Sequence, residues 1–238
     1  GDKLGHDFKL KAVECIKAGS GYPALFNDSL GIRRLMNTAT ATLDDAREWV
    51  PCGCVDINSP QRPPQWCVAH FNALKLFEIV LNDGINPVTG DKLFETQIRA
   101  EEASYEQIKE EWIRLVRVLL KKEADYWNIA MVIHNKMGLT LPFLSALLDD
   151  CILKGLHCQE GGCRYNDSPY FITCGLINVA NSLAAIKKCV FDDRLFSMGE
   201  LRKALDQNFE NGCEGMRIAL LKAPKFGNAD KYVDDIAS

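Results

Sequence analysis

The sequence predicts one globular unit in which helices alternate with short extended segments. Apolar residues recur at helical spacing along most of the chain, and short apolar runs between glycine and proline clusters indicate the extended segments. The chain has 238 residues, of which 47% are hydrophobic, and this is enough for one sizeable core or at most two small domains, with one domain as the default. No internal repeat, low-complexity tract or linker divides it.

The first third of the chain predicts helix, extended segment, helix and extended segment in that order. Helical apolar spacing over residues 10–16 ends at Gly19. The short apolar run 22–26, followed by a turn, predicts a buried strand. Thr42 has the position and chemistry of an N-cap, with Asp45 at the third helical position. The next helix leads to an extended segment near Trp49, which ends in a loop because glycine, asparagine and proline follow it.

The rest of the chain is predicted to be mainly helical. Each predicted helix has apolar residues at intervals of three and four and ends near glycine, asparagine or proline. These helices span residues 67–81, 105–137, 142–153, 177–191 and 198–209, and a polar tail follows the last one.

Composition excludes several classes of function. The chain carries 28 basic and 32 acidic residues with the two signs interspersed, so its net charge of -4 gives no nucleic-acid footprint or basic membrane patch. No apolar run approaches the roughly 20 residues of a membrane span, and no secretory signal is visible. We therefore expect a cytoplasmic protein with no nucleic-acid or membrane partner.

Ten cysteines suggest a reducing compartment, because their spacing is too irregular for a disulfide framework. Cys15, Cys151 and Cys189 lie in apolar helical patterns and are predicted to be buried thiols. His157, Cys158, Cys163 and Cys174 raise the alternative of a zinc module, which stoichiometric zinc in the purified protein would reveal. Their spacing is not the paired C-x-x-C arrangement of structural zinc sites, so we expect no metal.

Gly53-Cys54-Val55-Asp56 combines a thiol with a carboxylate two residues later. In an extended segment, the period of two places Cys54 and Asp56 on one face, where they can exchange a hydrogen atom and a proton with neighbouring atoms of one substrate. By itself the pattern is also that of a buried cysteine before a turn, with Asp56 bonded by backbone N–H groups.

Other motifs along the chain favour a specific interpretation of this loop. Gly21-Tyr22-Pro23-Ala24-Leu25-Phe26-Asn27-Asp28 precedes it, and Gln159-Glu160-Gly161-Gly162-Cys163-Arg164-Tyr165-Asn166 follows it. Residues 181–188 and 223–228 add two further matches. In this order the motifs resemble those of glycyl radical enzymes of the glycerol dehydratase, choline lyase and hydroxyphenylacetate decarboxylase group, which are pyruvate formate-lyase-like.

The resemblance implies an α/β fold, namely a portion of a ten-stranded barrel with surrounding helices. It implies that residues 1–238 are the catalytic-cysteine portion of a pyruvate formate-lyase-like domain, without the C-terminal glycine radical domain. Nothing in the sequence resembles the Arg-Val-x-Gly-Tyr loop whose glycine stores the radical. In the family a radical S-adenosylmethionine activase installs that radical, so no bound cofactor is expected here. The implied partners are the activase, the remaining portion of the enzyme, a small-molecule substrate and, when complete, a second copy in a homo-oligomer.

The resemblance also assigns residues. Cys54 stands where the family has the cysteine that forms the thiyl radical, and Asp56 stands where most members have a glutamate, so its carboxylate is one methylene shorter. Glu160, Asn27 and Arg164 are candidate substrate contacts or supports of the site. Two alternatives remain open: Glu160 and Arg164 pair with each other across a tight loop, and Asn27 caps the following helix. Cys52 is expected to be structural.

The expected function is a segment of a glycyl radical lyase. A thiyl radical at Cys54 would abstract hydrogen from a small organic substrate and so trigger cleavage of a C–O, C–N, C–S or C–C bond, in the manner of a dehydratase or decarboxylase. The isolated chain is expected to be inactive. A non-catalytic scaffold subunit or degenerate paralogue of the same fold is the alternative. The loop is common to several lyase classes, so the sequence does not select the substrate.

Overall fold

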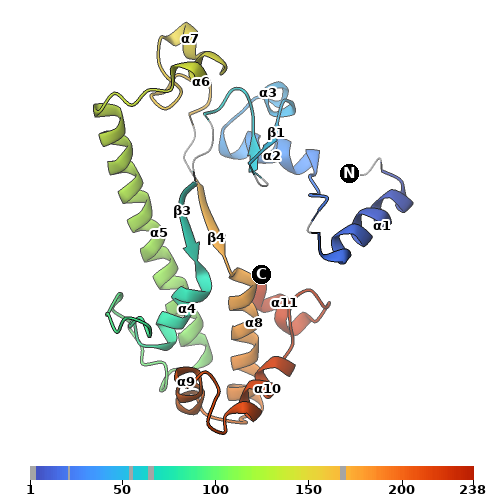
Figure 1. The fold of residues 1–238 in the computed structure, drawn as a ribbon, viewed down its shortest axis with the longest axis vertical. Coiled ribbons are helices and arrows are strands. Elements are labelled where there is room, and N and C mark those ends of the chain that lie inside the picture. The colour runs from blue at the N-terminus through green and yellow to red at the C-terminus, as the bar shows by residue number, and fades with distance from the viewer. Residues whose placement is uncertain (1–3, 21, 54–55, 64–66, 167–169) are drawn as a thin grey trace. The chain divides into compact units, whose positions relative to one another are not determined.

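The computed structural model describes residues 4–20, 22–53, 56–63, 67–166 and 170–238. Within these residues the chain forms two compact units, each assembled from two stretches of sequence (Figure 1). Unit 1 comprises residues 1–67 and 129–170, and unit 2 comprises residues 68–128 and 171–238. The long helix α5 (Tyr105–Lys136) contributes residues to both units.

Unit 1 begins with helix α1 (His6–Cys15) and the short π-helix η1 (Ile16–Ser20), as the apolar spacing predicts. Cys15 is exposed, so its assignment as a buried thiol is wrong; α1 buries only Ala12. The predicted strand over residues 22–26 is also wrong. This segment is irregular and leaves Leu25 exposed, since no strand pairs with it among the described residues.

The next elements of unit 1 are helix α2 (Asp28–Thr38), helix α3 (Leu43–Arg47) and the strands β1 (Val50–Cys52) and β2 (Asp56–Asn58). Helix α2 packs against α3 and β2 around a small apolar cluster. Its buried members are Leu35, Ala39, Ala41 and Ala46, with Ile32, Trp49, Ile57 and Tyr165 packed against them. The cluster ties the strands to the helices that precede them.

Two short helices replace the single helix predicted over residues 142–153. Helix α6 (Pro142–Ala146) ends at Leu147, and α7 (Cys151–Lys154) starts after Asp150, whose φ of 72° is incompatible with a continuous helix. Cys151 packs with the buried thiols of Cys158 and Cys163, as predicted for Cys151.

Unit 2 contains the strand pair β3 (Cys67–Asn72) and β4 (Tyr170–Cys174), followed in each case by a helix. The helix predicted over residues 67–81 is therefore half wrong: only α4 (Ala73–Leu81) is helical, and it begins where the Asn72 side chain accepts a hydrogen bond from the backbone N–H of Lys75. The β4 strand was not predicted. Helix α5 matches its prediction closely, and its Trp112 Nε1 donates to the carbonyl of Ala73 at 3.3 Å.

The remaining helices of unit 2 follow α8 (Leu176–Ile186), which continues into the π-helix η2 (Lys187–Asp192). They are α9 (Met198–Asp206), α10 (Glu214–Lys222) and α11 (Lys231–Ala237). The predicted polar tail is thus wrong, because α10 and α11 both pack against α8. The core centres on Leu76, Phe77, Ile108, Leu115, Val179 and Leu201. No helix of the described residues is long and apolar enough to cross a bilayer.

Candidate active site

Strands β1 and β2 form an antiparallel hairpin, which we call the cysteine hairpin because Cys54 lies between the two strands in the sequence. Val50 pairs with Asn58, Pro51 with Ile57 and Cys52 with Asp56. Gly53 starts the connection with a φ of 61°, a conformation that glycine adopts at no steric cost. Cys54 and Val55 lie outside the described residues, so the direction of the Cys54 thiol stays a prediction.

Asp56 lies at the first position of β2 and is half-buried. Since directly paired residues project from the same face, its side chain shares a face with that of the exposed Cys52. Its Oδ2 atom lies 3.7 Å from the point where a β-carbon on Gly53 would stand, so the carboxylate lies beside Gly53. A carboxylate in this place can accept a proton from a group held beside the hairpin tip.

Asn27 caps helix α2, which confirms the capping alternative. Its Oδ1 atom accepts hydrogen bonds from the Ser29 backbone N–H at 3.0 Å and from the Ser29 hydroxyl at 2.8 Å. The preceding Phe26 packs its ring against Trp49, with 6.0 Å between ring centroids. Because Trp49 directly precedes β1, these two residues link their motif to the base of the cysteine hairpin.

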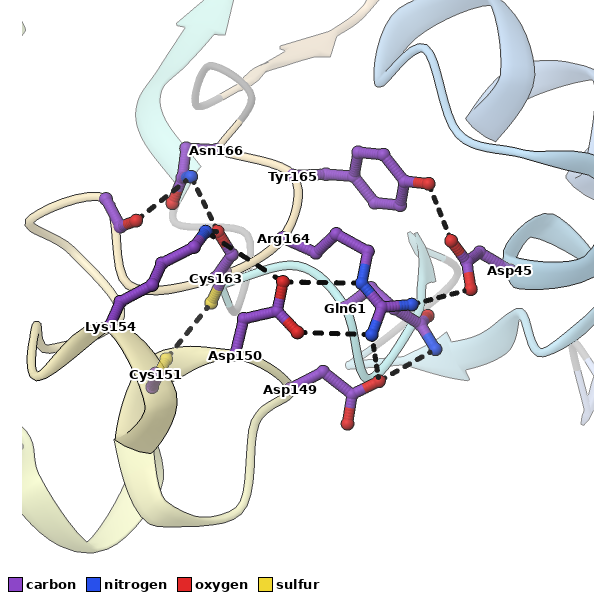
Figure 2. A network of polar contacts seen from close by, with 11 residues as sticks. Asp45, Gln61, Asp149, Asp150, Cys151, Lys154, Cys163, Arg164, Tyr165 and Asn166 are labelled. Carbon is purple, nitrogen blue, oxygen red and sulfur yellow. Dashed lines mark hydrogen bonds and ion pairs between the residues drawn. The ribbon is translucent and has the colours of Figure 1, made fainter.

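Arg164 lies among three carboxylates of unit 1 (Figure 2). Its guanidinium donates to Asp45 Oδ1 at 2.9 Å and to Asp150 Oδ1 at 3.1 Å, and it lies 3.6 Å from Asp149 Oδ2. The hydrogen bond to Asp150, and then that to Asp45, raise the pKa of the Arg164 guanidinium. The alternative pairing of Arg164 with Glu160 is therefore wrong.

Glu160 instead lies beside His157, with its Oε2 atom 3.3 Å from His157 Nε2. The contact lacks hydrogen-bond geometry, and Nε2 of the buried His157 has no hydrogen-bond partner. Glu160 lies on the loop at Gly161 and Gly162, and it remains a candidate contact of the site.

Residue 162 has to be glycine because the backbone of Leu156 and His157 approaches it closely. A β-carbon on this residue would lie 2.2 Å from the carbonyl oxygen of Leu156 and 2.8 Å from that of His157. The loop that carries Arg164, Tyr165 and Asn166 therefore folds against the segment after α7.

The thiols near this loop do not form a recognisable metal site. Cys151 Sγ and Cys163 Sγ lie 3.7 Å apart, and burial, with the contact to Cys151, raises the pKa of Cys163 to about 12. Within the described ranges, no group of three histidine, cysteine or acidic residues could hold a metal ion.

Sequence reasoning did not identify several residues that connect the site. Asp149, Asp150 and Gln61 all take part in the network around Arg164, together with Tyr165, which belongs to a motif visible in the sequence. The doublets Asp44-Asp45 and Asp149-Asp150 are visible in the sequence, but only folding brings Asp45, Asp149 and Asp150 to one guanidinium.

Comparison with known proteins places these features in a family. The model of the pyruvate formate lyase-like family matches residues 1–238. The indoleacetate decarboxylase of Tractidigestivibacter scatoligenes is 32% identical over 99% of the chain, and the 4-hydroxyphenylacetate decarboxylase glycyl radical subunit of Clostridium scatologenes is 31% identical over 99%. The chain spans 29% and 31% of these relatives' lengths.

A solved structure gives the same result for the fold. The glycerol-bound B12-independent glycerol dehydratase of Clostridium butyricum superposes with a TM-score of 0.83 and 32% identity, over 99% of this chain and 29% of that one. The helix-rich α/β segment described above corresponds to part of the α/β barrel fold of such enzymes, which confirms the predicted fold class. Since the family model matches from the first residue to the last, the chain belongs to the pyruvate formate lyase-like family.

Proposed function

We propose that this chain carries the catalytic-cysteine segment of a glycyl radical lyase, with Cys54 as the hydrogen-transferring thiol. The observation that carries the proposal is the hairpin: residues 53–55 lie in the sequence between two paired strands, and Asp56, which pairs with Cys52, places its carboxylate beside Gly53. Relatives named as a decarboxylase glycyl radical subunit and as a glycerol dehydratase support the reaction class.

The residues act in a fixed order in this proposal. A glycyl radical on another segment takes the hydrogen atom of the Cys54 S–H, so that glycine is restored and a thiyl radical forms. The thiyl takes a hydrogen atom from a substrate carbon, and the S–H bond forms again. Asp56 accepts a proton from the substrate radical, which weakens the neighbouring bond to the leaving group. After cleavage, the product radical takes the hydrogen atom back from Cys54. The thiyl that this leaves takes a hydrogen atom from the glycine and so restores the glycyl radical, and the proton on Asp56 passes to the leaving group or back to the product.

Glu160 and Asn27 differ in which of their atoms are available to contact a substrate. We propose Glu160 as a contact of the substrate or of a residue that binds it. The Oδ1 atom of Asn27 is engaged in helix capping, so only its amide nitrogen remains to contact a substrate.

The proposal extends to the cellular context. The described cysteines are free thiols, which supports a reducing cytoplasm. An activase that uses S-adenosylmethionine would generate the glycyl radical, the other segments of the enzyme would complete the barrel, and complete copies would associate as a homo-oligomer.

The test is a pair of cysteine variants of the full-length enzyme, activated without oxygen. Cys54→Ser should still form the glycyl radical but make no product, because an O–H bond is too strong to yield its hydrogen atom. Cys52→Ser is the matched control, two residues away on β1, and should keep activity within about threefold, as a change at an exposed position does. The measurement is product formed per radical, with radicals counted by electron paramagnetic resonance.

Two results would count against the assignment. Turnover by Cys54→Ser together with its loss in Cys52→Ser would transfer the role to Cys52. If the unaltered enzyme stores a radical but converts no substrate of a broad panel, and Cys54→Ser behaves identically, the chain is a scaffold or degenerate paralogue instead.

A further inference from the structure

The cysteine hairpin needs support from outside itself. Each strand has three residues, and Val50, Pro51 and Cys52 are all exposed. A two-stranded hairpin is marginally stable in water without further packing. Whatever fixes the position of residues 53–55 must therefore act at the base of the hairpin.

The turn after β2 is bound on two sides. Polar side chains are buried here, with 7% of Asn58, the last residue of β2, and 5% of Ser59 and 1% of Gln61 in the turn exposed. The Gln61 carbonyl accepts from the Tyr165 backbone N–H at 3.0 Å, and the carbonyl of Pro60 accepts from the Asp149 N–H at 3.2 Å. The Gln61 amide donates to Asp149 Oδ2 at 3.2 Å and to Glu48 Oε2 at 2.5 Å.

The segment before β1 is bound to the same loop. The Tyr165 hydroxyl donates to Asp45 Oδ2 at 2.6 Å and accepts from the Thr42 backbone N–H at 3.1 Å, while Arg164 Nη1 donates to Asp45 Oδ1. Asp45 lies on α3, directly before the hairpin, and Gln61 lies directly after it. The segment before the cysteine hairpin thus attaches directly to Arg164 and Tyr165, and the segment after it attaches to the Tyr165 backbone and, through Asp149, to Arg164 (Figure 2).

Charge makes Arg164 difficult to replace. Asp45, Asp149 and Asp150 all lie within 4 Å of its guanidinium. A planar guanidinium can donate to two carboxylates at fixed angles, whereas an ammonium group is a single point of charge. Without Arg164 the three carboxylates would repel one another in a partly buried place.

We propose that Arg164 and Tyr165 are positioning residues, which hold both ends of the cysteine hairpin and so fix where the Cys54 thiol meets its reaction partners. The catalytic part of this inference rests on the function proposed above. Hydrogen transfer requires reacting atoms about 3–3.5 Å apart, and a misplacement of about 1 Å costs on the order of 100-fold in rate. Arg164 then affects the chemical step without touching the substrate.

Amide hydrogen exchange of the full-length protein tests, without any substrate, whether Arg164 and Tyr165 hold the cysteine hairpin in place. Arg164→Ala should raise exchange in residues 50–58 by about tenfold or more, with a smaller rise in Tyr165→Phe, and leave helix α2 unchanged. Arg47→Ala is the matched control, because this arginine lies on α3 in an exposed ion pair with Asp44 and should change nothing. An unchanged hairpin, or an equal rise in α2, would overturn the inference.

Kinetic measurements test whether the position of the hairpin affects the chemical step. The assay uses whichever of glycerol, trans-4-hydroxy-L-proline, 4-hydroxyphenylacetate and indoleacetate the enzyme converts. Arg164→Ala should lower kcat per glycyl radical by about 10- to 100-fold with KM within about twofold, and Arg164→Lys should recover only part of the loss. A large rise in KM at unchanged kcat would instead make Arg164 a substrate contact.

The two proposals fail in different ways. If Cys54→Ser keeps turnover, the proposed function is wrong, whatever Arg164 does. If Cys54→Ser loses turnover while Arg164→Ala keeps its kcat per radical, the positioning role is wrong and the proposed function stands. The exchange measurement decides whether Arg164 and Tyr165 hold the cysteine hairpin in place, whichever substrate the enzyme uses.

Discussion

Asp45 shows how one side chain serves several contacts at once. The Thr42 hydroxyl accepts from its backbone N–H, while the Tyr165 hydroxyl and the Arg164 guanidinium donate to its carboxylate. The hydrogen bond from Tyr165 is the main reason that the pKa of Asp45 lies below its usual value, and those of Thr42 and Arg164 act in the same direction. Thr42 therefore caps α3 through the Asp45 backbone N–H, while the Asp45 carboxylate binds the helix to Arg164 and Tyr165.

This lowered pKa predicts an acid-sensitive contribution to stability. The unfolded chain holds the proton of Asp45 more tightly, so the contribution is present above the unfolded pKa of about 3.9 and is lost as pH falls through the lower folded value. Asp45→Asn should destabilise the protein near pH 7, and the difference from the unaltered protein should shrink below about pH 4. Denaturant unfolding at several pH values measures this. Asp44→Asn, at a side chain that is 91% exposed, is the control, and a pH-independent effect of Asp45→Asn would contradict the prediction.

Gly162 gives a second prediction at this scale. A β-carbon there would collide with two carbonyl oxygens, so the backbone must move to admit alanine. Gly162→Ala should cost about 1–3 kcal/mol in the free energy of unfolding, the range of an overpacked site. Gly215→Ala is the opposite case: Gly215 is the second residue of helix α10, its β-carbon would meet nothing within 4 Å, and the change should stabilise by at most about 1 kcal/mol. Thermal or denaturant unfolding compares the two variants, and equal effects would show that the close approach is unimportant.

Elements whose signals are local could be predicted from the sequence. Helix α5 was predicted because its apolar residues keep helical spacing, and α3 because Thr42 is a strong cap. Strand β3 was read as helix because its apolar residues continue into α4, and only Asn72 and the pairing with β4 mark the boundary. The segment 22–26 has strand composition but no partner strand among the described residues. Pairing over long sequence separations is what spacing alone does not reveal.

The site likewise contains parts that the sequence predicts and parts that it does not. The motif around Cys54 and the Arg164-Tyr165-Asn166 triplet were recognised from the sequence. The contacts that join them, from Tyr165 to Asp45 and from Gln61 to Asp149, link residues 120 and 88 positions apart. No local pattern predicts which carboxylate such an arginine will meet, so its pairing with Glu160 was a reasonable but wrong alternative.

Across the whole molecule, considerable apolar surface is exposed on the described residues. Helices α6 and α7 leave Phe143 80%, Ile152 76% and Leu153 88% exposed. Soluble proteins usually cover apolar patches of this kind. The chain spans only 29% of a relative such as the indoleacetate decarboxylase, and under the function proposed above other segments of the enzyme would cover these residues.

This dependence on other segments predicts the behaviour of a polypeptide made of these 238 residues alone. It should form no glycyl radical and convert no substrate, even with an activase and a reductant present. The sequence contains no Arg-Val-x-Gly-Tyr loop, so a thiyl radical at Cys54 would have no initiator. The measurement is electron paramagnetic resonance after activation under strict anaerobiosis, with the full-length enzyme treated in parallel as the positive control. A glycyl doublet from the isolated polypeptide would mean that one of its own glycines stores a radical. The hypothesis that Cys54 receives its radical from a glycine on another segment would then be wrong.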